Sequence, residues 1–316
     1  MEDQLAAVLR SSLLGHIWAL DFAAFEMWLP RAVEHLAFHL VRLAEPQEAV
    51  RLERLLAFAA EQRSPLRPRL DGAAEDEARF AGPLAHAVIA GPLSSRPSPS
   101  SELLGGTSYR AIRHFVAQAV AAPRVDGLLL EFDTPGGAVM GCRETFDALR
   151  AANAQKPVWA VVSGHCCSAG YWLASAARRI IASPSAEVGS VGVYGVHEDR
   201  SAQYEASGVR HTVISAGRLK AEDLDVRPLS EDARGRMQAR VDQVFQDFVD
   251  CVAAGRRTTP EAVRSGYGEG AVLGARESMA AGLVDEIGTV EQAAARFADV
   301  LGDFRRRAEV SALAAR

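Results

Sequence analysis

Residues 127–137 read GLLLEFDTPGG, and residues 158–170 read VWAVVSGHCCSAG. Each stretch begins with an apolar run that predicts a buried strand, and each run ends in small or turn-forming residues. The pattern of residues 143–152 predicts a helix between the two strands, and residues 168–178 predict a second helix of small side chains. Strands that alternate with helices are typical of a mostly parallel sheet, so this region predicts an α/β fold.

The pattern extends on both sides of this region. We expect further strands at 87–90 and 180–181, a helix at 108–120 and a long amphipathic helix at 237–252. The whole chain then divides into a helical N-terminal region at 1–62, a linker at 63–84, a main domain at 85–300 and a C-terminal tail at 301–316.

Composition excludes several classes of protein. The 316 residues include 35 Lys and Arg against 40 Asp and Glu, a formal charge of -5, which argues against binding to nucleic acid through phosphate contacts. No apolar run reaches the roughly 18 residues of a membrane span. The chain opens with Glu2 and Asp3 rather than with the basic start of a signal peptide. We therefore expect an intracellular protein with neither a nucleic acid nor a membrane as partner.

The spacing of cysteines and histidines does not indicate a metal site. Two of the four cysteines are adjacent and the other two lie far away, which fits neither a zinc site nor a disulfide scaffold: Cys142, Cys166, Cys167 and Cys251. His35 and His39 have the i, i+4 spacing of a metal pair, but no third ligand accompanies them. We expect these histidines to pack a helix, and we expect no metal and no cofactor.

Lysine is rare in this chain. Lys156 and Lys220 are its two lysines, and all the other residues among its 35 Lys and Arg are arginine. Lysine can act as a neutral amine base, whereas arginine stays protonated. Lys156 precedes Pro157 at the start of a predicted strand, so a solvated surface charge is the expectation there. Lys220 is then the candidate for chemistry.

Two turns at predicted strand ends are candidate parts of a site. Ser168 lies at a strand-to-helix junction, where it is either an activated nucleophile or an ordinary helix N-cap. The glycines in DTPGG at 133–137 allow close backbone approach and outward-pointing N–H groups, although a Pro-Gly-Gly sequence is more often a plain tight turn.

Several blocks in order resemble one family: DTPGG (133–137), SAGYWLASAA (168–177), GSVGV (189–193), HED (197–199), AGRLK (216–220), PLS (228–230), FVDCVAAGR (248–256) and GLVDEIG (282–288). They resemble the serine peptidases related to signal peptide peptidase A, and more narrowly the phage minor-capsid-protein-C-type peptidases of head assembly. The resemblance covers residues 85 to 295. It implies a spiral α/β fold of the crotonase and Clp-protease type.

The resemblance also implies roles for particular residues. Ser168 matches the nucleophile, Lys220 the general base, and Ser190 a serine that binds the lysine amine. Gly136 or Gly137, together with the N–H of Ala169, matches the oxyanion hole. An unperturbed lysine has a pKa of about 10.4, so acting as a base near neutral pH requires a decrease of about 3 units.

The function implied is that of a serine endopeptidase with a Ser–Lys dyad. Its expected substrates are scaffold, portal or the chain itself during procapsid assembly, in the cytoplasm of a bacterial host or within the procapsid. The family further implies a homo-oligomer in which the serine and the lysine meet across a protomer boundary. The runner-up is a cytosolic peptidase that degrades signal peptides or other short peptides.

Four alternatives use other chemistry. They are a cysteine hydrolase with Cys166 or Cys167 and His165, a Ser-His-Asp triad with His197 or His211, an acyl-CoA enzyme of the same fold, and a non-catalytic head-assembly protein. Neighbours on a strand point to opposite faces, which disfavours the pairing of His165 with Cys166. An acyl-CoA enzyme has no use for the Ser–Lys pair.

Overall fold

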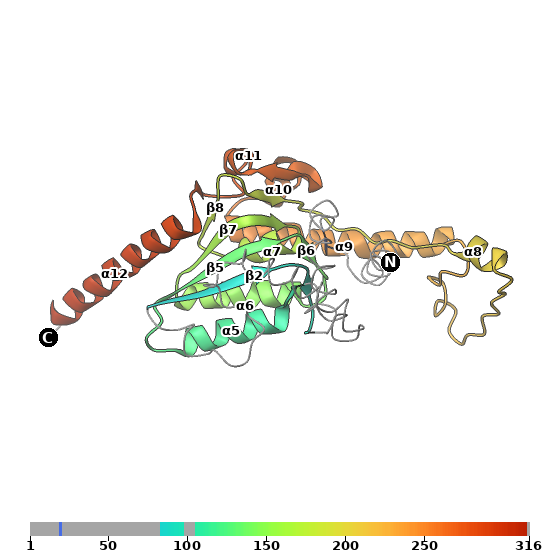
Figure 1. The fold of residues 1–316 in the computed structure, drawn as a ribbon, viewed down its shortest axis with the longest axis horizontal. Coiled ribbons are helices and arrows are strands. Elements are labelled where there is room, and N and C mark those ends of the chain that lie inside the picture. The colour runs from blue at the N-terminus through green and yellow to red at the C-terminus, as the bar shows by residue number, and fades with distance from the viewer. Residues whose placement is uncertain (1–18, 21–82, 98–104, 315–316) are drawn as a thin grey trace, which may run out of the picture.

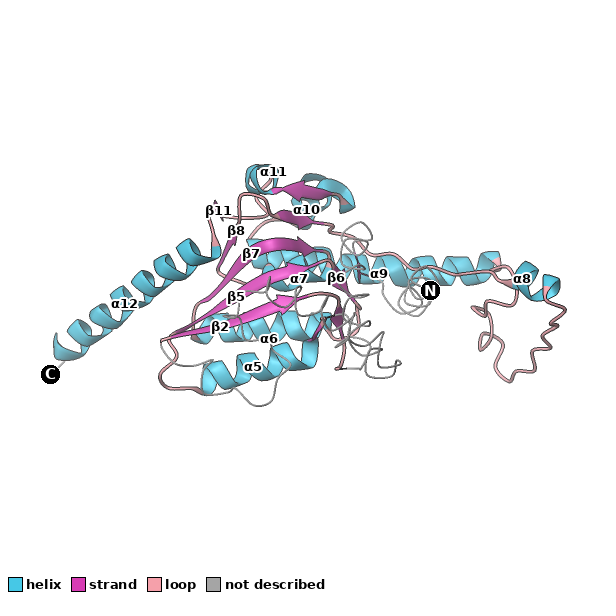
Figure 2. Ribbon diagram, viewed as in Figure 1, coloured by secondary structure: helices cyan, strands magenta, loops and turns pink. Residues whose placement is uncertain are grey.

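The computed structural model describes residues 19–20, 83–97 and 105–314. Figure 1 shows a central sheet with helices packed against it, and two long helices that extend away from the sheet in opposite directions. Figure 2 shows the strands of the sheet lying side by side, with helices beneath them.

The main sheet contains seven strands: β2 (Leu84–Ala90), β5 (Gly127–Thr134), β7 (Val158–Cys167), β8 (Arg179–Ala182), β9 (Glu187–Gly189), β10 (Val272–Gly274) and β11 (Glu286–Ile287). Their order is β10-β9-β7-β5-β2, with β8 paired to β7 and β11 paired to β8. Every pairing is parallel except that of β9 with β10. The predicted α/β class with a mostly parallel sheet is therefore confirmed.

A smaller sheet is formed by short strands beside the DTPGG turn: β1 (Ala19–Leu20), β6 (Gly136–Gly137), β3 (Leu93–Ser94) and β4 (Thr107–Ser108), in the order β1-β6-β3-β4. β1 pairs antiparallel with β6. Helix was the wrong prediction for these two residues of the N-terminal region, because their backbone joins the edge of β6. The rest of the region, with His35 and His39, and residues 63–82 of the linker lie outside the described residues.

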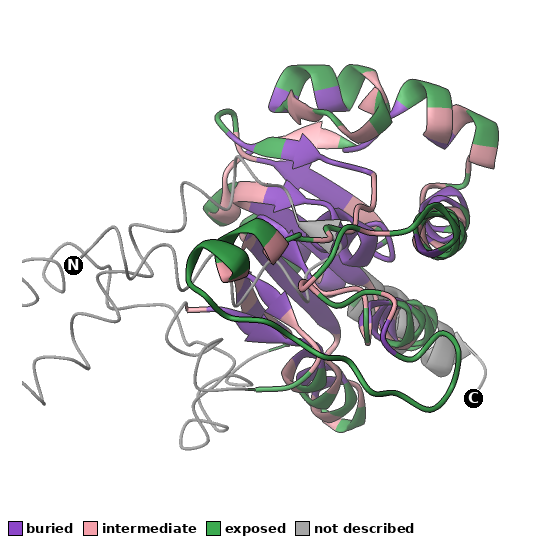
Figure 3. Ribbon diagram, turned by 90° about the vertical axis from the view of Figure 1, so that its right-hand side faces the viewer, coloured by how far each residue is buried: buried purple, intermediate pink, exposed green. Residues whose placement is uncertain are grey.

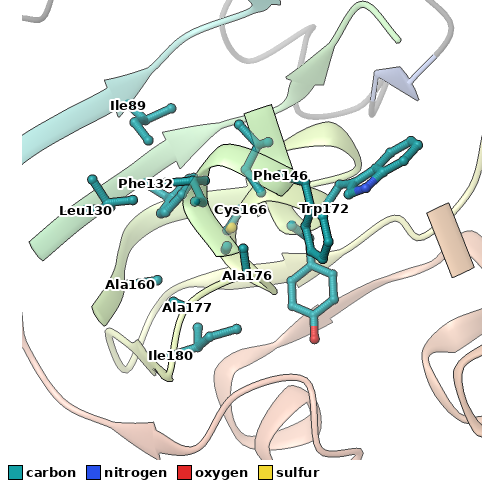
Figure 4. Packing of buried hydrophobic residues seen from close by; sticks show 14 of the residues in the cluster. Ile89, Leu130, Phe132, Phe146, Ala160, Cys166, Trp172, Ala176, Ala177 and Ile180 are labelled. Carbon is teal, nitrogen blue, oxygen red and sulfur yellow. The ribbon is translucent and has the colours of Figure 1, made fainter. Parts of the chain in front are cut away.

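Helices cover the two faces of the main sheet. One face packs α5 (Tyr109–Ala121), α6 (Cys142–Gln155), α7 (Ala169–Ala174) and α9 (Glu231–Arg256); the other packs α12 (Val290–Ala314). Side-chain alternation along β5 places Leu128, Leu130 and Phe132 in the larger core, part of which Figure 4 shows. Leu129 belongs to the smaller core under α12.

Stacked aromatic pairs anchor the two longest helices. Trp172 of α7 stacks on Phe248 of α9 with ring centroids 4.5 Å apart, and Trp159 of β7 stacks on Phe297 of α12 at 4.5 Å. Such pairs add to the free energy gained by burial of the rings. α12 continues without a break across the predicted boundary between residues 300 and 301. The domain boundaries themselves remain predictions.

α7 is shorter than the helix predicted for residues 168–178. It ends at Ala174, and turns follow. The Arg178 N–H donates to the Val158 carbonyl oxygen at 2.8 Å, so the chain has already joined β7 before β8 begins at Arg179. The small side chains of this segment therefore serve a tight turn as well as a helix.

Close packing of α9 against the turn after α7 gives a test of this arrangement. An ideal Cβ at Gly255 would lie 2.1 Å from the Ser175 carbonyl oxygen, so we expect Gly255→Ala to lower the free energy of unfolding by about 1–3 kcal/mol. Gly235 of the same helix has nothing within 4 Å of its ideal Cβ. Gly235→Ala should instead raise stability by up to about 1 kcal/mol. The measurement is the urea unfolding midpoint of each variant. Equal shifts of this midpoint in Gly255→Ala and Gly235→Ala would contradict this packing.

The remaining elements are α8 (Ser201–Ala206), α10 (Pro260–Gly266), a 3-10 helix (Gly268–Gly270) and α11 (Ala275–Ala280). α8 belongs to a segment, residues 193–230, that we call the arm. Figure 1 shows α8 and the loop after it at the far right of the view, beyond the sheet. Near its start the arm runs along α9, because an ideal Cβ at Gly195 would lie 3.7 Å from both Met237 and Val241.

Candidate active site

The candidate site lies where three neighbouring parallel strands end. β5 leads into the DTPGG turn, β7 into Ser168, and β9 into Ser190. Parallel strands have their carboxyl ends at one edge of a sheet, which is where open α/β sheets bind ligands. The order of these strands thus brings Ser168, Ser190 and the two glycines of β6 to one edge.

Ser168 has a strained backbone. Its φ is 51° and its ψ is -119°, a combination that is rare for residues other than glycine. Its N–H donates to the Gly189 carbonyl oxygen at 2.8 Å, and its Oγ donates to the Gly192 carbonyl oxygen at 3.4 Å. The side chain makes no capping hydrogen bond to α7, so the simple N-cap interpretation is wrong. Such strain is typical of residues that a functional site holds in place.

Ser190 is the second serine at this edge, and its φ is also positive, at 52°. Its N–H donates to the Ala271 carbonyl oxygen at 2.7 Å, which ties the end of β9 to the residue before β10. Ser190 is 9% exposed. Among the described residues, no partner hydrogen-bonds its hydroxyl, so that this group remains able to bind an incoming amine.

The DTPGG turn is held by the Thr134 hydroxyl. This fully buried group donates to the Gly91 carbonyl oxygen at 2.6 Å and accepts the Gly136 N–H at 3.1 Å. Thr134 Cγ2 also lies 2.5 Å from the ideal Cβ position of Gly170. Because the Gly136 N–H is engaged, Gly137 is the better oxyanion-hole candidate of the two glycines. The sequence alone gave no signal for these contacts of Thr134.

Gly137 and Ala169 occupy crowded positions. An ideal Cβ at Gly137 would lie 2.0 Å from the Leu93 carbonyl oxygen, so β6 can pair with β3 this closely only with glycine there. Ala169 is fully buried at the start of α7, next to Ser168. The expected oxyanion-hole residues are therefore fixed by packing around them.

Lys220 lies apart from these residues. It is exposed, in a tight turn where its N–H donates to the Gly217 carbonyl oxygen at 3.0 Å and where Gly217 has a φ of 96°. Its amine forms no hydrogen bond or ion pair with any residue that the structure describes. Within one chain, the structure does not bring Lys220 to Ser168.

The arm that carries Lys220 is ordered by contacts within itself and with α9. Asp225 accepts the Tyr204 hydroxyl at 2.9 Å, and the Asp225 carbonyl oxygen accepts the Arg200 N–H at 2.7 Å. Glu222 pairs with Arg236 of α9, with one contact at 2.8 Å. Residues 205–220 are nevertheless exposed throughout, as the long green loop in Figure 3 shows. The arm therefore has a defined path but little cover from its own chain.

Exposed apolar side chains concentrate on the arm. Of the eight large apolar residues that are exposed in the described ranges, six belong to it: Val196, Val209, Val213, Ile214, Leu219 and Leu224. Ile214 is 93% exposed and lies six residues before Lys220. Apolar groups that gather on an exposed segment typically mark an interaction surface.

Lys156 is not the solvated charge that the sequence predicted. Its Nζ donates to the carbonyl oxygens of Ala119 and Ala122, at 3.0 and 2.7 Å, at the end of α5. Partial burial lowers the pKa of this amine. The carbonyl groups at a helix C-terminus lack partners within the helix, which explains this position for a lysine. Lys156 is thus structural.

The cysteine and histidine alternatives find no support in the geometry. Cys166 and Cys167 are fully buried, and burial raises the pKa of the Cys166 thiol, which disfavours the reactive thiolate. His197 contacts the Arg227 carbonyl oxygen, and His211 packs on Tyr204. No contact joins either histidine to Ser168 in the described part of the chain. The burial of the two adjacent cysteines fits a role in packing.

Two further findings bear on partners. Within the described ranges, no three His, Cys, Asp or Glu side chains gather in a way that could hold a metal ion. The helices that the structure describes include none that is long and apolar enough to cross a membrane.

Comparison with known proteins shows which family this chain is similar to. Residues 150–302 match the model of peptidase family S49. The chain is 37% identical over 199 residues to capsid assembly protease C of Escherichia phage lambda, covering 63% of this chain and 45% of the relative. Head-tail preconnector protein GP5 of Enterobacteria phage P21 is 32% identical, covering 63% of this chain and 39% of the relative. Protease 4 of Salmonella typhi is 32% identical, covering 56% and 29%.

The chain spans less than half the length of each of these three relatives. Among solved structures, a mutant ClpP1 from Listeria monocytogenes aligns with a TM-score of 0.40 and 14% identity, covering 65% of this chain and 91% of that one. The family resemblance read from the sequence blocks is confirmed by the match of residues 150–302 to the model of peptidase family S49.

Proposed function

We propose that this chain is a serine endopeptidase in which Ser168 is the nucleophile and Lys220 the general base. The observation that carries the proposal is the buried, strained Ser168 at the end of β7, beside Ser190 and the glycines of β6. A serine hydroxyl needs a base to accept its proton. Of the two lysines, Lys156 is engaged at the end of α5, which leaves Lys220 for this role.

The proposed reaction has two steps. The neutral amine of Lys220 takes the proton of the Ser168 hydroxyl while Oγ attacks the peptide carbonyl carbon. The Gly137 and Ala169 N–H groups stabilise the oxyanion. As the C–N bond breaks, the lysine ammonium returns the proton to the leaving amine. Water then hydrolyses the Ser168 ester by the same route, and the enzyme is restored.

The amine must come from a neighbouring protomer in this proposal. Lys220 is exposed on the arm, and the arm carries six of the exposed apolar side chains. Docking of the arm on a second copy would bury these side chains and desolvate the amine, which favours its neutral form. Ser190 would then hydrogen-bond the amine. A homo-oligomer with dyads formed in trans follows from the proposal.

An extended peptide suits the proposed site. β1 pairs antiparallel with β6 and thereby demonstrates that the edge of β6 accepts an added strand. Strand addition at a sheet edge supplies main-chain hydrogen bonds with little dependence on sequence. β1 occupies this edge in the single chain, so we propose that an extended substrate takes the place of β1 beside β6, with its carbonyl group between Gly137 and Ala169.

The biological setting follows from the relatives. Capsid assembly protease C of phage lambda and protein GP5 of phage P21 are phage proteins. We propose that this chain acts in the head maturation of a phage or prophage, in the host cytoplasm or the procapsid, on scaffold, portal or itself. The test is incubation of the purified chain with the portal and scaffold proteins of the same phage. The same preparation must first be shown to cleave an unfolded protein. If it does so but leaves the portal and scaffold proteins intact, this setting is contradicted.

Serine chemistry is tested directly by a serine-reactive fluorophosphonate. Peptide mapping by mass spectrometry should locate the label on Ser168, because activation by a base makes that hydroxyl the reactive one. Ser175 provides a control, since its buried hydroxyl donates to the Trp172 carbonyl oxygen at 2.7 Å. Label on Ser175 or on another serine in preference to Ser168 would contradict the proposed nucleophile.

Thiol reagents should leave the activity intact. All four cysteines are free and buried, so a bulky reagent such as a maleimide should label the folded chain slowly and leave proteolysis within about twofold of the untreated rate. Cys167→Ala should behave likewise, which avoids any steric effect of a reagent beside Ser168. Loss of activity in Cys167→Ala with an unchanged melting temperature would favour a cysteine nucleophile instead.

A further inference from the structure

A bulge in β7 lies just before Ser168. In the pairing of β5 with β7, Phe132 is opposite Val162 and Thr134 is opposite Cys166. Three residues of β7, Ser163 to His165, are therefore opposite the single residue Asp133. Bulges redirect the strand that follows them and are common next to active sites. This bulge determines the direction in which β7 delivers Ser168.

The Asp133 carboxylate fills the bulge. Its Oδ1 accepts the His165 N–H at 3.1 Å and would lie 2.3 Å from an ideal Cβ at position 164, so that position must be glycine. The Ser163 hydroxyl donates to the Phe132 carbonyl oxygen at 3.4 Å, which supports the other side of the bulge.

The His165 imidazole lies between two carboxylates. Its Nδ1 is 3.5 Å from Asp133 Oδ1 and its Nε2 is 3.4 Å from Glu187 Oε2. Its side chain is only 20% exposed. A neutral imidazole has one N–H, so facing a carboxylate at each nitrogen favours the doubly protonated cation. One side chain thus links β5, β7 and β9 through charge.

The strands that His165 links carry the site. Past His165, β7 ends at Cys167, directly before Ser168; past Glu187, β9 ends at Gly189, whose carbonyl oxygen accepts the Ser168 N–H. The next residue is Ser190. We propose that Asp133, His165 and Glu187 form a clamp in which cationic His165 is a positioning residue that holds Ser168 and Ser190 in register. This proposal rests on the proposed peptidase function and deepens it.

A second histidine–carboxylate pair provides a matched control. His86 Nε2 lies 3.2 Å from Glu131 Oε2, between β2 and β5. Glu131 precedes Asp133 by two residues, so strand alternation places both on one face of the sheet. Two titratable groups that face His165 are Asp133 from β5 and Glu187 from β9. The His86 pair lies further from the strand ends and touches neither Ser168 nor Ser190.

The kinetic test compares His165→Gln, Glu187→Gln and His86→Gln with the wild type on an unfolded protein substrate. His165→Gln should lower kcat by about 10- to 100-fold with KM changed less than about threefold, because small displacements of a nucleophile carry large penalties. Glu187→Gln should also lower kcat. His86→Gln should keep the wild-type kcat. Equal kcat for His165→Gln and the wild type, or equal losses for His165→Gln and His86→Gln, would overturn the clamp.

The pH profile separates positioning from simple loss of packing. Deprotonation of His165 removes one of its two carboxylate contacts, so the ratio of wild-type to His165→Gln kcat should fall as pH rises through about 5.5–8.5. Taking the ratio cancels the pH dependence of the lysine base, which both proteins share. A ratio that stays constant with pH would overturn the cationic clamp.

A readout without activity distinguishes this inference from the peptidase proposal. In the Ser168→Ala background, His165→Gln should speed amide exchange at positions 168 and 190, whose N–H groups donate to Gly189 and Ala271. His86→Gln should leave these amides unchanged. Unchanged exchange in His165→Gln would overturn the clamp. An active Ser168→Ala enzyme would overturn only the proposed nucleophile.

Discussion

Replacing Ser168 with alanine is expected to reduce proteolysis by at least about 1,000-fold, because the nucleophile is lost while the rest of the site remains. The melting temperature should change little, since the Ser168 hydroxyl makes one long hydrogen bond, at 3.4 Å to Gly192. Alanine at this positive φ is expected to keep the backbone strain of serine, so the melting temperature is a fair control for folding. The measurement is cleavage of an unfolded protein at saturating substrate.

Substitution of Lys220 should reduce proteolysis as strongly as substitution of Ser168, and the conservative change to arginine is the most informative. Lys220→Arg keeps the positive charge but removes the amine that can become neutral, so activity should fall as far as in Lys220→Ala. Lys156→Arg is the matched control: its contacts with the carbonyl oxygens at the end of α5 suit a guanidinium equally, and activity should be retained. Cleavage by Lys220→Arg near the wild-type rate would refute the base assignment.

The parts of the fold that the sequence predicted are those with a strong local pattern. β5 and β7 are apolar runs, and α9 carries apolar residues along one face, so their type could be recognised without knowledge of their neighbours. The position of Ser168 followed from the same pattern, because it is the first residue after a predicted strand. Its backbone strain did not, since φ depends on the pairing of β7 with β9.

What the sequence did not reveal depends on contacts between distant residues. The amine of Lys156 reaches carbonyl groups 34 and 37 residues earlier in the chain, which local pattern does not encode. The clamp joins Asp133, His165 and Glu187 from three strands, and its parts become neighbours only once the sheet is assembled. The role of Thr134 was hidden for the same reason, because the Gly91 carbonyl oxygen that its hydroxyl binds lies on a separate segment.

The position of Lys220 could not be read from the sequence, because the fold of one chain does not bring together the two residues of the proposed dyad. Ser168 is 1% exposed at the edge of the main sheet, whereas Lys220 is exposed on the arm. Only the second half of α9 packs against the body of its own chain: apart from Ala233, its six buried residues all lie between Phe248 and Gly255. The arm and the first half of α9 therefore form one surface that a neighbouring copy can cover.

Mixing two inactive variants should therefore restore activity. Ser168→Ala protomers keep Lys220, and Lys220→Ala protomers keep Ser168, so an interface between the two contains one complete dyad if the arm reaches across it. After random one-to-one exchange, about a quarter of the dyads in a closed oligomer combine an intact serine with an intact lysine, so activity should recover to about a quarter of the wild-type value.

The control and the concentration dependence make the experiment decisive. Substituting the double variant Ser168→Ala/Lys220→Ala for the Ser168→Ala partner removes every intact lysine, and no recovery is expected. Wild-type specific activity should also rise with protein concentration, since a protomer alone lacks the base. Ile214→Asp should weaken both association and activity, because this 93% exposed side chain belongs to the surface that the neighbour would bury. Absence of recovery, with subunit exchange verified by native mass spectrometry, would place both residues of the dyad in one chain.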